Sequence, residues 1–291
     1  MILLLTLYFN VLRRGILMAK ITMEQIGEVT IIPASSVARI TGSEKEGVFI
    51  EGRNVNLTSF QMCRNLVTQE LFESVMGYNP GTSNFLASAQ EDKQLLPINN
   101  VSWYEAIVFC NKLSRQMGLR PCYRISGTSE PDTWGGIPTT SNTLWNSVDW
   151  DTNADGFRLP TEAEWEFAAR GGNTTATAWK FPYAGGDSID TVAWFKDNSA
   201  SNIHQVGLKQ STSSGINDMS GNVYEWCWDW FARITTGDHV NPIGPENGTN
   251  RVRRGGSWLN YARSCTVTYR NCDSPETIYG NIGFRLARSS V

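Results

Sequence analysis

Helical periodicity is confined to three short stretches of this 291-residue sequence, and long segments rich in Gly, Pro, Asn, Asp, Ser and Thr separate them. This pattern predicts sparse regular secondary structure, with loops forming much of the fold. Eleven Trp and 26 Gly favour an aromatic core. The turn-rich segment of residues 127–160 is expected to contribute to that core rather than to link two domains, because large apolar side chains recur in it. These side chains are Trp134, Trp145, Trp150, Phe157 and Leu159.

Two of the three predicted helices lie in the first half of the chain. The first spans about Thr68 to Met76, with its apolar residues on one face, and stops at Gly77. The second begins at a capping box formed by Ser102 and Glu105 and ends near Gly118. Because an apolar stripe runs along the second helix, we expect it to be buried.

The third predicted helix begins at Pro160, and Thr161 and Glu164 form its capping box. Together with Glu162 and Glu166, Glu164 makes a group of carboxylates that resembles a catalytic cluster. We interpret the group as structural, because acidic side chains near a helix N-terminus complement the exposed N–H groups and the helix dipole. Two glycines at positions 171 and 172 are expected to end the helix.

One large domain is predicted from the length of the chain and its 41% apolar content, and we place it at residues 23–291. Residues 1–22 contain an apolar run that is too short to span a membrane. Two arginines follow that run, an order that does not fit a signal peptide. We expect this segment to be disordered or not native, with Met18 or Met23 as alternative translation starts.

Charge and cysteine spacing narrow the classes of partner and site. The formal net charge is -3, and Lys and Arg are spread over the whole length, so we expect no nucleic-acid partner. The six cysteines show no C-x-x-C spacing, and most are expected to be buried free thiols. They are Cys63, Cys110, Cys122, Cys227, Cys265 and Cys272.

Three long motifs stand in the second half of the chain. They are GFRLPTEAEWEFAARGG (156–172), INDMSGNVYEWCWDWF (216–231), and RVRRGGSW (251–258) with NIGFRLARS (281–289). Together they resemble the sulfatase-modifying-factor domain, the family of the formylglycine-generating enzyme. The resemblance implies an α+β fold, the variant of the C-type lectin fold of that enzyme, with little regular secondary structure. It also implies a ligand surface formed largely by the C-terminal segment.

The oxidising members of that family use a pair of cysteines after the GGS sequence, where two thiolates can hold Cu(I). The second of these positions falls on Cys265 and the first on Asn260. An amide cannot replace a soft anionic ligand, and Cys272 lies too far along the chain to fill the position. We therefore predict that the chain is not an enzyme. A divergent copper-dependent oxidase of the sulfatase-modifying class is the alternative.

Another enzymatic branch that resembles this family holds non-haem iron with three histidines. This chain has two, His204 and His239, which cannot supply a three-histidine site. Both stand in turn-rich sequence, and we expect both to be exposed loop residues.

Calcium is the one metal for which the resemblance implies a site. In NDMSGNVYEW, the family's calcium-binding loop matches Asp218 and Glu225 as side-chain ligands and Gly221 and Val223 as carbonyl ligands. The alternative is that the two carboxylates only order the turn and cap neighbouring backbone groups. The sequence leaves both open, and no other cofactor is expected.

The segment from Leu259 to Asn281 lies between two family-like ends and has no amphipathic period. It resembles the variable segment of the proteins that diversity-generating retroelements rewrite at adenine positions. Only Glu276 in this segment is of a type that randomising the first two bases of an AAC codon cannot produce. The resemblance implies that the ligand-binding residues lie here. They are Leu259, Asn260, Tyr261, Arg263, Ser264, Tyr269, Asn271, Cys272, Asp273, Ser274, Thr277, Tyr279, Gly280 and Asn281.

The composition of this segment favours binding, because Tyr and Arg give large or bidentate contacts while Ser, Asn and Gly adapt their hydrogen bonds. We expect Tyr261, Arg263, Tyr269 and Tyr279 to anchor an unknown protein or cell-surface ligand, a role that favours a cell-surface or extracellular location. Arg285 is expected to pair with a carboxylate. The scaffold residues are predicted to be Trp258, Cys265, Ile282, Phe284 and Leu286. A lectin-like structural module with a fixed partner is a further alternative.

Overall fold

The computed structural model describes residues 23–26, 29–31, 47–81, 91–174 and 177–289, so the predicted N-terminal segment lies outside the described residues. The α-helices are α2 (Gln69–Met76), α3 (Trp103–Gln116), α4 (Thr143–Asn146), α5 (Glu162–Ala169) and α6 (Ile189–Val192). The 3-10 helices are η1 (Lys93–Leu95), η2 (Pro131–Thr133), η3 (Thr177–Lys180) and η4 (Ala262–Cys265). The strands are β1 (Met23–Ile26), β2 (Val29–Ile31), β3 (Arg53–Leu57), β4 (Phe60–Cys63), β5 (Tyr123–Arg124), β6 (Asp149–Trp150), β7 (Phe157–Arg158), β8 (Tyr224–Trp230), β9 (Gly237–Val240), β10 (Arg251–Arg254), β11 (Arg270–Asp273), β12 (Ile282–Gly283) and β13 (Ala287–Ser289).

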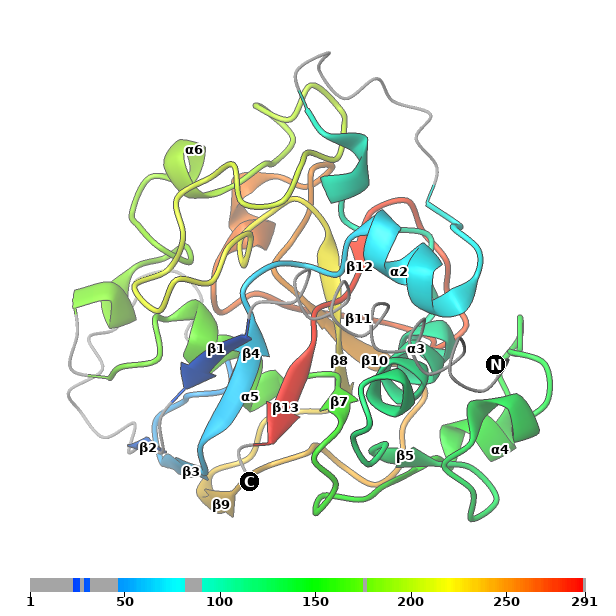
Figure 1. Ribbon diagram of the computed structural model, residues 1–291. Coiled ribbons are helices and arrows are strands. Elements are labelled where there is room, and N and C mark those ends of the chain that lie inside the picture. The colour runs from blue at the N-terminus through cyan, green and yellow to red at the C-terminus, as the bar shows by residue number, and fades with distance from the viewer. Residues whose placement is uncertain (1–22, 27–28, 32–46, 82–90, 175–176, 290–291) are drawn as a thin grey trace.

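The strands form several small sheets rather than one large one (Figure 1). Their orders are β1-β4-β13-β7, β11-β10-β8-β12 and β2-β3-β9, and β5 pairs with β6. The second of these sheets positions the C-terminal segment, since β10 precedes that segment, β11 belongs to it and β12 follows it. Within the sheet, β8 pairs antiparallel with β10 and parallel with β12.

All three predicted helices are present and begin at their predicted caps. α2 ends at Gly77, whose φ of 84° is a left-handed conformation that glycine adopts without steric cost. The capping box of Ser102 and Glu105 starts α3, and that of Thr161 and Glu164 starts α5. Among the helices of the described ranges, none has the length and apolar character that a membrane crossing requires.

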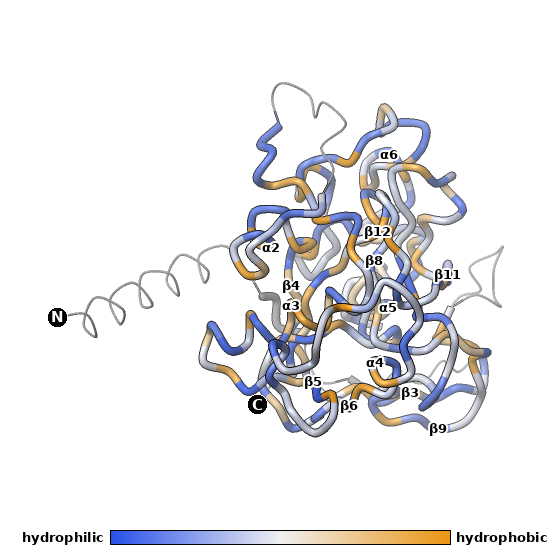
Figure 2. The backbone as a smooth tube through the Cα atoms, turned by 90° about the vertical axis from the view of Figure 1, so that its right-hand side faces the viewer, coloured by the Kyte–Doolittle hydropathy of each residue, from blue (hydrophilic) through white to orange (hydrophobic). Residues whose placement is uncertain are grey.

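The core is aromatic, as predicted. Every residue of β8, YEWCWDW, is buried, so both faces of this strand are covered. The Trp228 ring stacks on Tyr123 with the centroids 5.1 Å apart. The Arg251 guanidinium lies 3.8 Å from the Trp103 ring centroid and 3.5 Å from that of Trp230. Short hydrophobic and hydrophilic stretches alternate along the chain (Figure 2), and α2 and α3 lie together on one side of the molecule (Figure 1).

The turn-rich segment before β7 contributes to this core. Trp134, Trp145, Phe157 and Leu159 are buried in the largest apolar cluster, and Trp150 packs against it. The expectation of buried free thiols is also confirmed, because all six cysteines are free and five of them are buried.

Candidate binding surface

The segment from Leu259 to Asn281 forms an irregular excursion from the sheet that contains β8. It follows β10, passes through η4, returns to the sheet as β11 and reaches β12 through a turn. β11 pairs antiparallel with β10 and forms one edge of the sheet. The excursion is therefore anchored on a buried scaffold, which is how proteins commonly position binding loops.

Four large apolar side chains of this segment are exposed. Leu259 is 53% exposed, Tyr261 54%, Ile278 47% and Tyr279 52%. They stand at the two ends of the segment, and Ile278 is an addition to the residues that the sequence predicted. Grouped exposed apolar side chains of this kind mark interaction sites on proteins.

Hydrogen bonds tie the two ends of the segment together. The Trp258 Nε1 atom donates to the carbonyl oxygen of Gly280 over 3.2 Å. The Asn281 Nδ2 atom donates to the Ser257 hydroxyl, also over 3.2 Å. These two bonds therefore bring the exposed residues at the beginning of the segment close to those at its end.

We call residues 257–261 together with residues 278–281 the paired ends. Tyr261 is held in place there, because its hydroxyl accepts a hydrogen bond from Lys196 Nζ over 2.8 Å and the ammonium lies 4.1 Å from the ring centroid. Such a contact at an exposed site contributes about 0.5–1 kcal/mol. Arg263 is exposed next to this group. The paired ends thus present ordered aromatic and aliphatic side chains to solvent.

Two predicted contact residues are less exposed than the side chains of the paired ends. Ser264 is 7% exposed, and its N–H donates to the carbonyl of Tyr261 within η4. Tyr269 is half-buried against the largest apolar cluster, and its carbonyl accepts from Arg254. Their role in ligand binding stays a prediction, and the contact of Tyr269 with the core was not visible in any local period of the sequence.

The remaining predicted residues lie on β11 and in the turn after it, and all are half-buried. They are Asn271, Cys272, Asp273, Ser274 and Thr277. Asp273 pairs with Arg253 of the neighbouring strand at 2.8 Å. The hydroxyls of Ser274 and Thr277 lie 2.9 Å apart and stabilise the turn. These side chains partly support the sheet edge, so the most accessible part of the segment is the paired ends.

Asn260 stands at the position of the family's first cysteine, and its amide is engaged in a turn. The Ser257 hydroxyl donates to Asn260 Oδ1, and the carbonyl of Asn260 accepts from the N–H of Lys196 over 2.9 Å. Cys265 is buried, and burial raises the pKa of its thiol to about 12. In the absence of a metal ion, the neutral thiol is therefore favoured at this position.

The GGS sequence before this turn has a packing role that is independent of catalysis. Gly256 has a φ of 71°, and a Cβ atom there would lie 2.6 Å from the sulfur of Cys265. Only glycine permits this close approach. Gly256 is thus needed for the close packing of Cys265 against the backbone, independently of any catalytic role.

The sequence profile of the sulfatase-modifying factor enzyme 1-like domain matches residues 17–290. The chain belongs to this family. Chaperone protein LppX of Paenibacillus barcinonensis is 33% identical over 255 residues, which cover 81% of this chain and 82% of that protein. The formylglycine-generating enzyme of Streptomyces coelicolor is 34% identical over 165 residues, which cover 50% of this chain and 51% of the enzyme. The similarity to this enzyme therefore spans about half of either protein.

Solved structures of the sulfatase-modifying-factor type share the fold over nearly the whole chain. Treponema denticola variable protein 1 superposes with a TM-score of 0.81 and 36% identity, covering 93% of this chain and 95% of that one. CarF superposes with a TM-score of 0.66 and 24% identity, covering 93% and 99%. The fold is thus the α+β variant of the C-type lectin fold that the three motifs predicted.

The family's calcium loop is held by other contacts in this member. Both carboxylate oxygens of Glu225 accept hydrogen bonds from the Arg285 guanidinium, one of them over 2.9 Å, which confirms the predicted pairing of Arg285. Asp218 accepts from the N–H of Gly207 over 2.7 Å, and burial raises its pKa to about 6. A calcium ion fits poorly where a buried guanidinium already occupies Glu225. Whether this loop binds calcium is a question for a binding experiment.

The carboxylates of α5 do more than complement the helix N-terminus. Each forms a buried or nearly buried ion pair with an arginine, and Glu162 and Glu166 form two each. The pairs are Arg270–Glu162, Arg254–Glu162, Arg158–Glu164, Arg170–Glu166 and Arg254–Glu166. The structural interpretation of these acids holds, but the helix dipole alone does not account for them, because they join α5 to β7, β10 and β11.

His204 is buried, which corrects the expectation of an exposed loop residue. Its Nδ1 atom lies 2.8 Å from a carboxylate oxygen of Glu91, and its Nε2 atom lies 2.8 Å from the carbonyl oxygen of Ser199. The imidazole also stacks on Trp194 with the centroids 3.8 Å apart. His239 lies on β9 and is half-buried. Turn-rich sequence around a histidine therefore did not predict its exposure.

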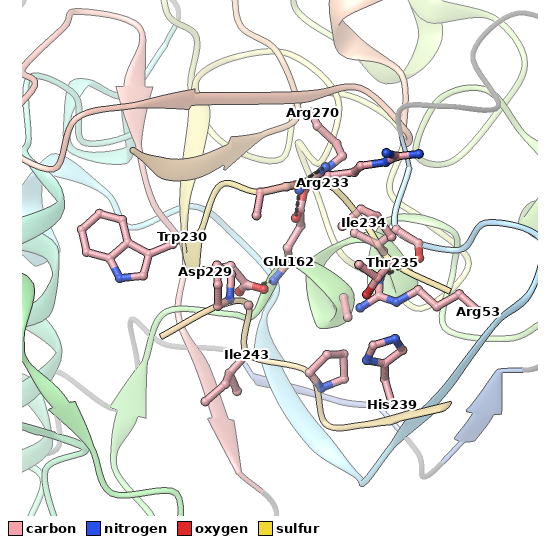
Figure 3. A pocket seen from close by; sticks show the side chains of 16 residues that line it. Arg53, Glu162, Asp229, Trp230, Arg233, Ile234, Thr235, His239, Ile243 and Arg270 are labelled. Carbon is pink, nitrogen blue, oxygen red and sulfur yellow. Dashed lines mark hydrogen bonds and ion pairs between the residues drawn. The ribbon is translucent and has the colours of Figure 1, made fainter. Parts of the chain in front are cut away.

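A pocket of about 450 Å³ at the end of β8 was not predicted from the sequence (Figure 3). Arg53, Asp229 and Arg233 are among the residues that line it. The one signal in the sequence was an acidic residue, Asp229, inside the aromatic run YEWCWDWF. Nothing in the sequence connected that residue with Arg53, which lies far away along the chain.

Proposed function

We propose that this protein is a non-enzymatic ligand-binding protein that presents a diversified C-terminal surface on a C-type lectin scaffold. The observation that carries the proposal is the exposure of four large apolar side chains on the paired ends, where two hydrogen bonds hold them together. Exposed aromatic residues on a rigid frame bind with a small loss of side-chain entropy. In this proposal residues 259–281 are the variable segment of a diversity-generating retroelement.

Two further features support this role. The chain is similar over nearly its whole length to a protein that is itself called a variable protein. The side chains at the paired ends also support little of the core, so substitutions there are compatible with the fold. A surface that can change while its frame stays fixed is what a diversified binding protein requires.

The chemistry of the cysteine positions supports the absence of oxidase activity. Asn260 has no thiol to offer, and Cys265 is held as a buried neutral thiol. Copper coordination by a cysteine pair would need a second thiolate, which position 260 does not supply.

Sequencing the gene from several isolates tests the proposal directly. We expect codon differences to concentrate within residues 259–281 and to fall at adenines, with an imperfect copy of the segment and a reverse-transcriptase gene nearby. The matched controls are the flanking codons for residues 251–258 and 282–289, which should stay constant. An invariant segment without a nearby copy would overturn the diversification proposal.

A copper-dependent oxidase is the second candidate, and the cysteine at position 265 together with the half-length similarity to formylglycine-generating enzymes favours it. Oxygen consumption is measured with Cu(I)-loaded protein and a cysteine-containing peptide. We expect no consumption above that of the Cys265→Ser variant. Copper-dependent oxidation of the peptide that this substitution abolishes would establish the enzyme instead.

A further inference from the structure

The pocket at the end of β8 is separate from the paired ends. The start of β3, the first turn of α5 and the loop around β9 enclose it, and Figure 3 shows their side chains converging on one space. Only Arg270, at the start of β11, belongs both to this pocket and to the C-terminal segment. The volume of the pocket, about 450 Å³, is within the range of sites for small molecules.

One acid and one base of the pocket already neutralise each other. The Arg270 guanidinium donates to both carboxylate oxygens of Glu162, over 2.6 and 2.7 Å. This forked pair closes one wall of the pocket. The charges that remain to receive a ligand are those of Arg53, Asp229 and Arg233.

Arg53 is a buried base with unused donors. It is 6% exposed, and its Nη1 atom donates to the carbonyl of Val48 over 2.8 Å. Its Nε atom is buried without a hydrogen-bond partner, an arrangement that costs free energy unless a ligand or a rearrangement satisfies it. Figure 3 shows the side chain reaching into the pocket from β3. Guanidinium groups with free donors are suited to carboxylates.

Asp229 is a buried acid on the opposite side of the pocket from Arg53 (Figure 3). It is also 6% exposed, and one of its oxygens accepts from the N–H of Glu162 over 2.8 Å. Burial, reinforced by the negative charge of Glu162, raises the pKa of Asp229 to about 7. A cationic donor beside this carboxylate would relieve the cost of its desolvation.

We propose that this pocket binds a zwitterionic small molecule of the α-amino acid class with an apolar side chain. The ligand carboxylate pairs with Arg53, and the ligand ammonium pairs with Asp229. Its side chain packs on the apolar walls formed by Val48, Ile234 and Ile243. Arg233, exposed at the mouth, adds positive charge that attracts the carboxylate end.

Charge balance selects a zwitterion over a simple anion or cation. A lone carboxylate would pair with Arg53 and bring no cationic donor to Asp229, whose one hydrogen bond described above comes from a backbone N–H. A lone amine would do the reverse. Only a ligand with both groups pairs both buried residues, and a buried charge left unpaired is costly. An amino acid is the smallest common ligand that carries both charges beside an apolar group.

Calorimetry on the full chain with three matched probes tests this assignment. L-leucine carries both charges, 4-methylpentanoate lacks the ammonium, and isoamylamine lacks the carboxylate. We expect leucine to bind at least about tenfold more tightly than either analogue. Arg53→Gln should weaken leucine and 4-methylpentanoate at least about tenfold and leave isoamylamine unchanged. Asp229→Asn should weaken leucine and isoamylamine and leave 4-methylpentanoate unchanged.

Arg115→Gln, the same substitution at an exposed position of α3 outside the pocket, is the matched control and should change none of the three affinities. If Arg53→Gln fails to fold, Arg53→Lys keeps the charge but loses the planar fork, and it should weaken both carboxylate probes. The proposal is wrong if leucine gives no binding at about 10 mM, a concentration that would reveal millimolar affinity. It is equally wrong if each variant changes the affinities of all three probes alike.

Discussion

The C-terminal part of the chain contains two regions of opposite character. One is the buried scaffold around the ion pairs Arg254–Glu166 and Arg285–Glu225, which we call the frame. The side chains of both pairs have no solvent exposure. At the paired ends, Leu259, Tyr261, Ile278 and Tyr279 each expose about half of their surface. The two regions adjoin along the chain, yet one fixes the fold and the other meets solvent. In the proposed function, stability and recognition are therefore assigned to different residues, which would allow the surface to change while the fold persists.

The largest effect is expected from breaking the frame. Arg285→Gln leaves the Glu225 carboxylate buried without its counter-charge, which costs about 3–5 kcal/mol of unfolding free energy. Urea unfolding measures the loss. The double variant Arg285→Gln with Glu225→Gln removes both charges and should recover part of it. A loss below about 1 kcal/mol for the single variant would show that the frame does not depend on this pair.

A second effect distinguishes two buried acids. Glu225 is paired with the guanidinium of Arg285, whereas Asp229 accepts from a backbone N–H. Because the pKa of Asp229 is raised from 3.8 to about 7, the folded state keeps a proton that the unfolded state has released between these pH values. Stability from this group is thus present below about pH 4 and is lost as pH rises towards 7. Asp229→Asn should be more stable relative to wild type at pH 8 than at pH 4, by roughly 1–4 kcal/mol.

Unfolding of both proteins at a series of pH values measures this difference. Asp218, whose raised pKa of about 6 acts in the same direction, is present in both proteins and cancels. A wild-type-minus-variant difference that does not change with pH would contradict the assignment of Asp229.

A smaller effect is expected at the paired ends. Tyr279→Ala should change the unfolding free energy by no more than about 0.5 kcal/mol, because its ring is largely solvated. Tyr261→Ala should cost no more than about 1 kcal/mol, because it also loses the contact with Lys196. Tyr224→Ala, a buried tyrosine of the same sheet region, is the matched control and should cost about 3–5 kcal/mol. If the surface variants lose as much stability as this control, the tyrosines are core residues and the proposed surface is wrong.

The smallest effect is expected from calcium. Because Arg285 occupies both oxygens of Glu225, adding about 1 mM calcium after chelation should leave the melting temperature unchanged. A functional site with a Kd of about 10 μM would add about 2.7 kcal/mol at that concentration. A stabilisation of that size, lost in Glu225→Gln, would restore the calcium loop of the family to this protein.

The sequence predicted the fold because the decisive features are local. Capping residues such as Ser102 and Thr161 act within a single helical turn, and each long motif is a continuous stretch of sequence. The missing thiol at Asn260 could also be found by counting along the chain. The family resemblance predicted that Arg285 pairs with a carboxylate, although it did not identify Glu225 as the partner.

The sequence could not separate the accessible residues of segment 259–281 from the buried ones. Tyr269 and Tyr279 have similar neighbours in sequence, yet the first packs against the core and the second is exposed. Burial of His204 depends on Glu91 and Trp194, which are brought to it only by the tertiary fold. The pocket is harder still to predict from the sequence, because loops whose course no periodicity specifies bring Arg53 and Asp229 to its two sides.

Cys272 gives the molecule a natural position for a spectroscopic reporter. It is the one cysteine of the six that is not fully buried, and it lies on β11 within the C-terminal segment. A maleimide dye added to the native protein would therefore attach predominantly at one place. Burial and the neighbouring Asp273 raise the pKa of this thiol, so labelling proceeds faster at alkaline pH. The resulting fluorophore would sense occupancy of the surrounding surface without any engineered residue.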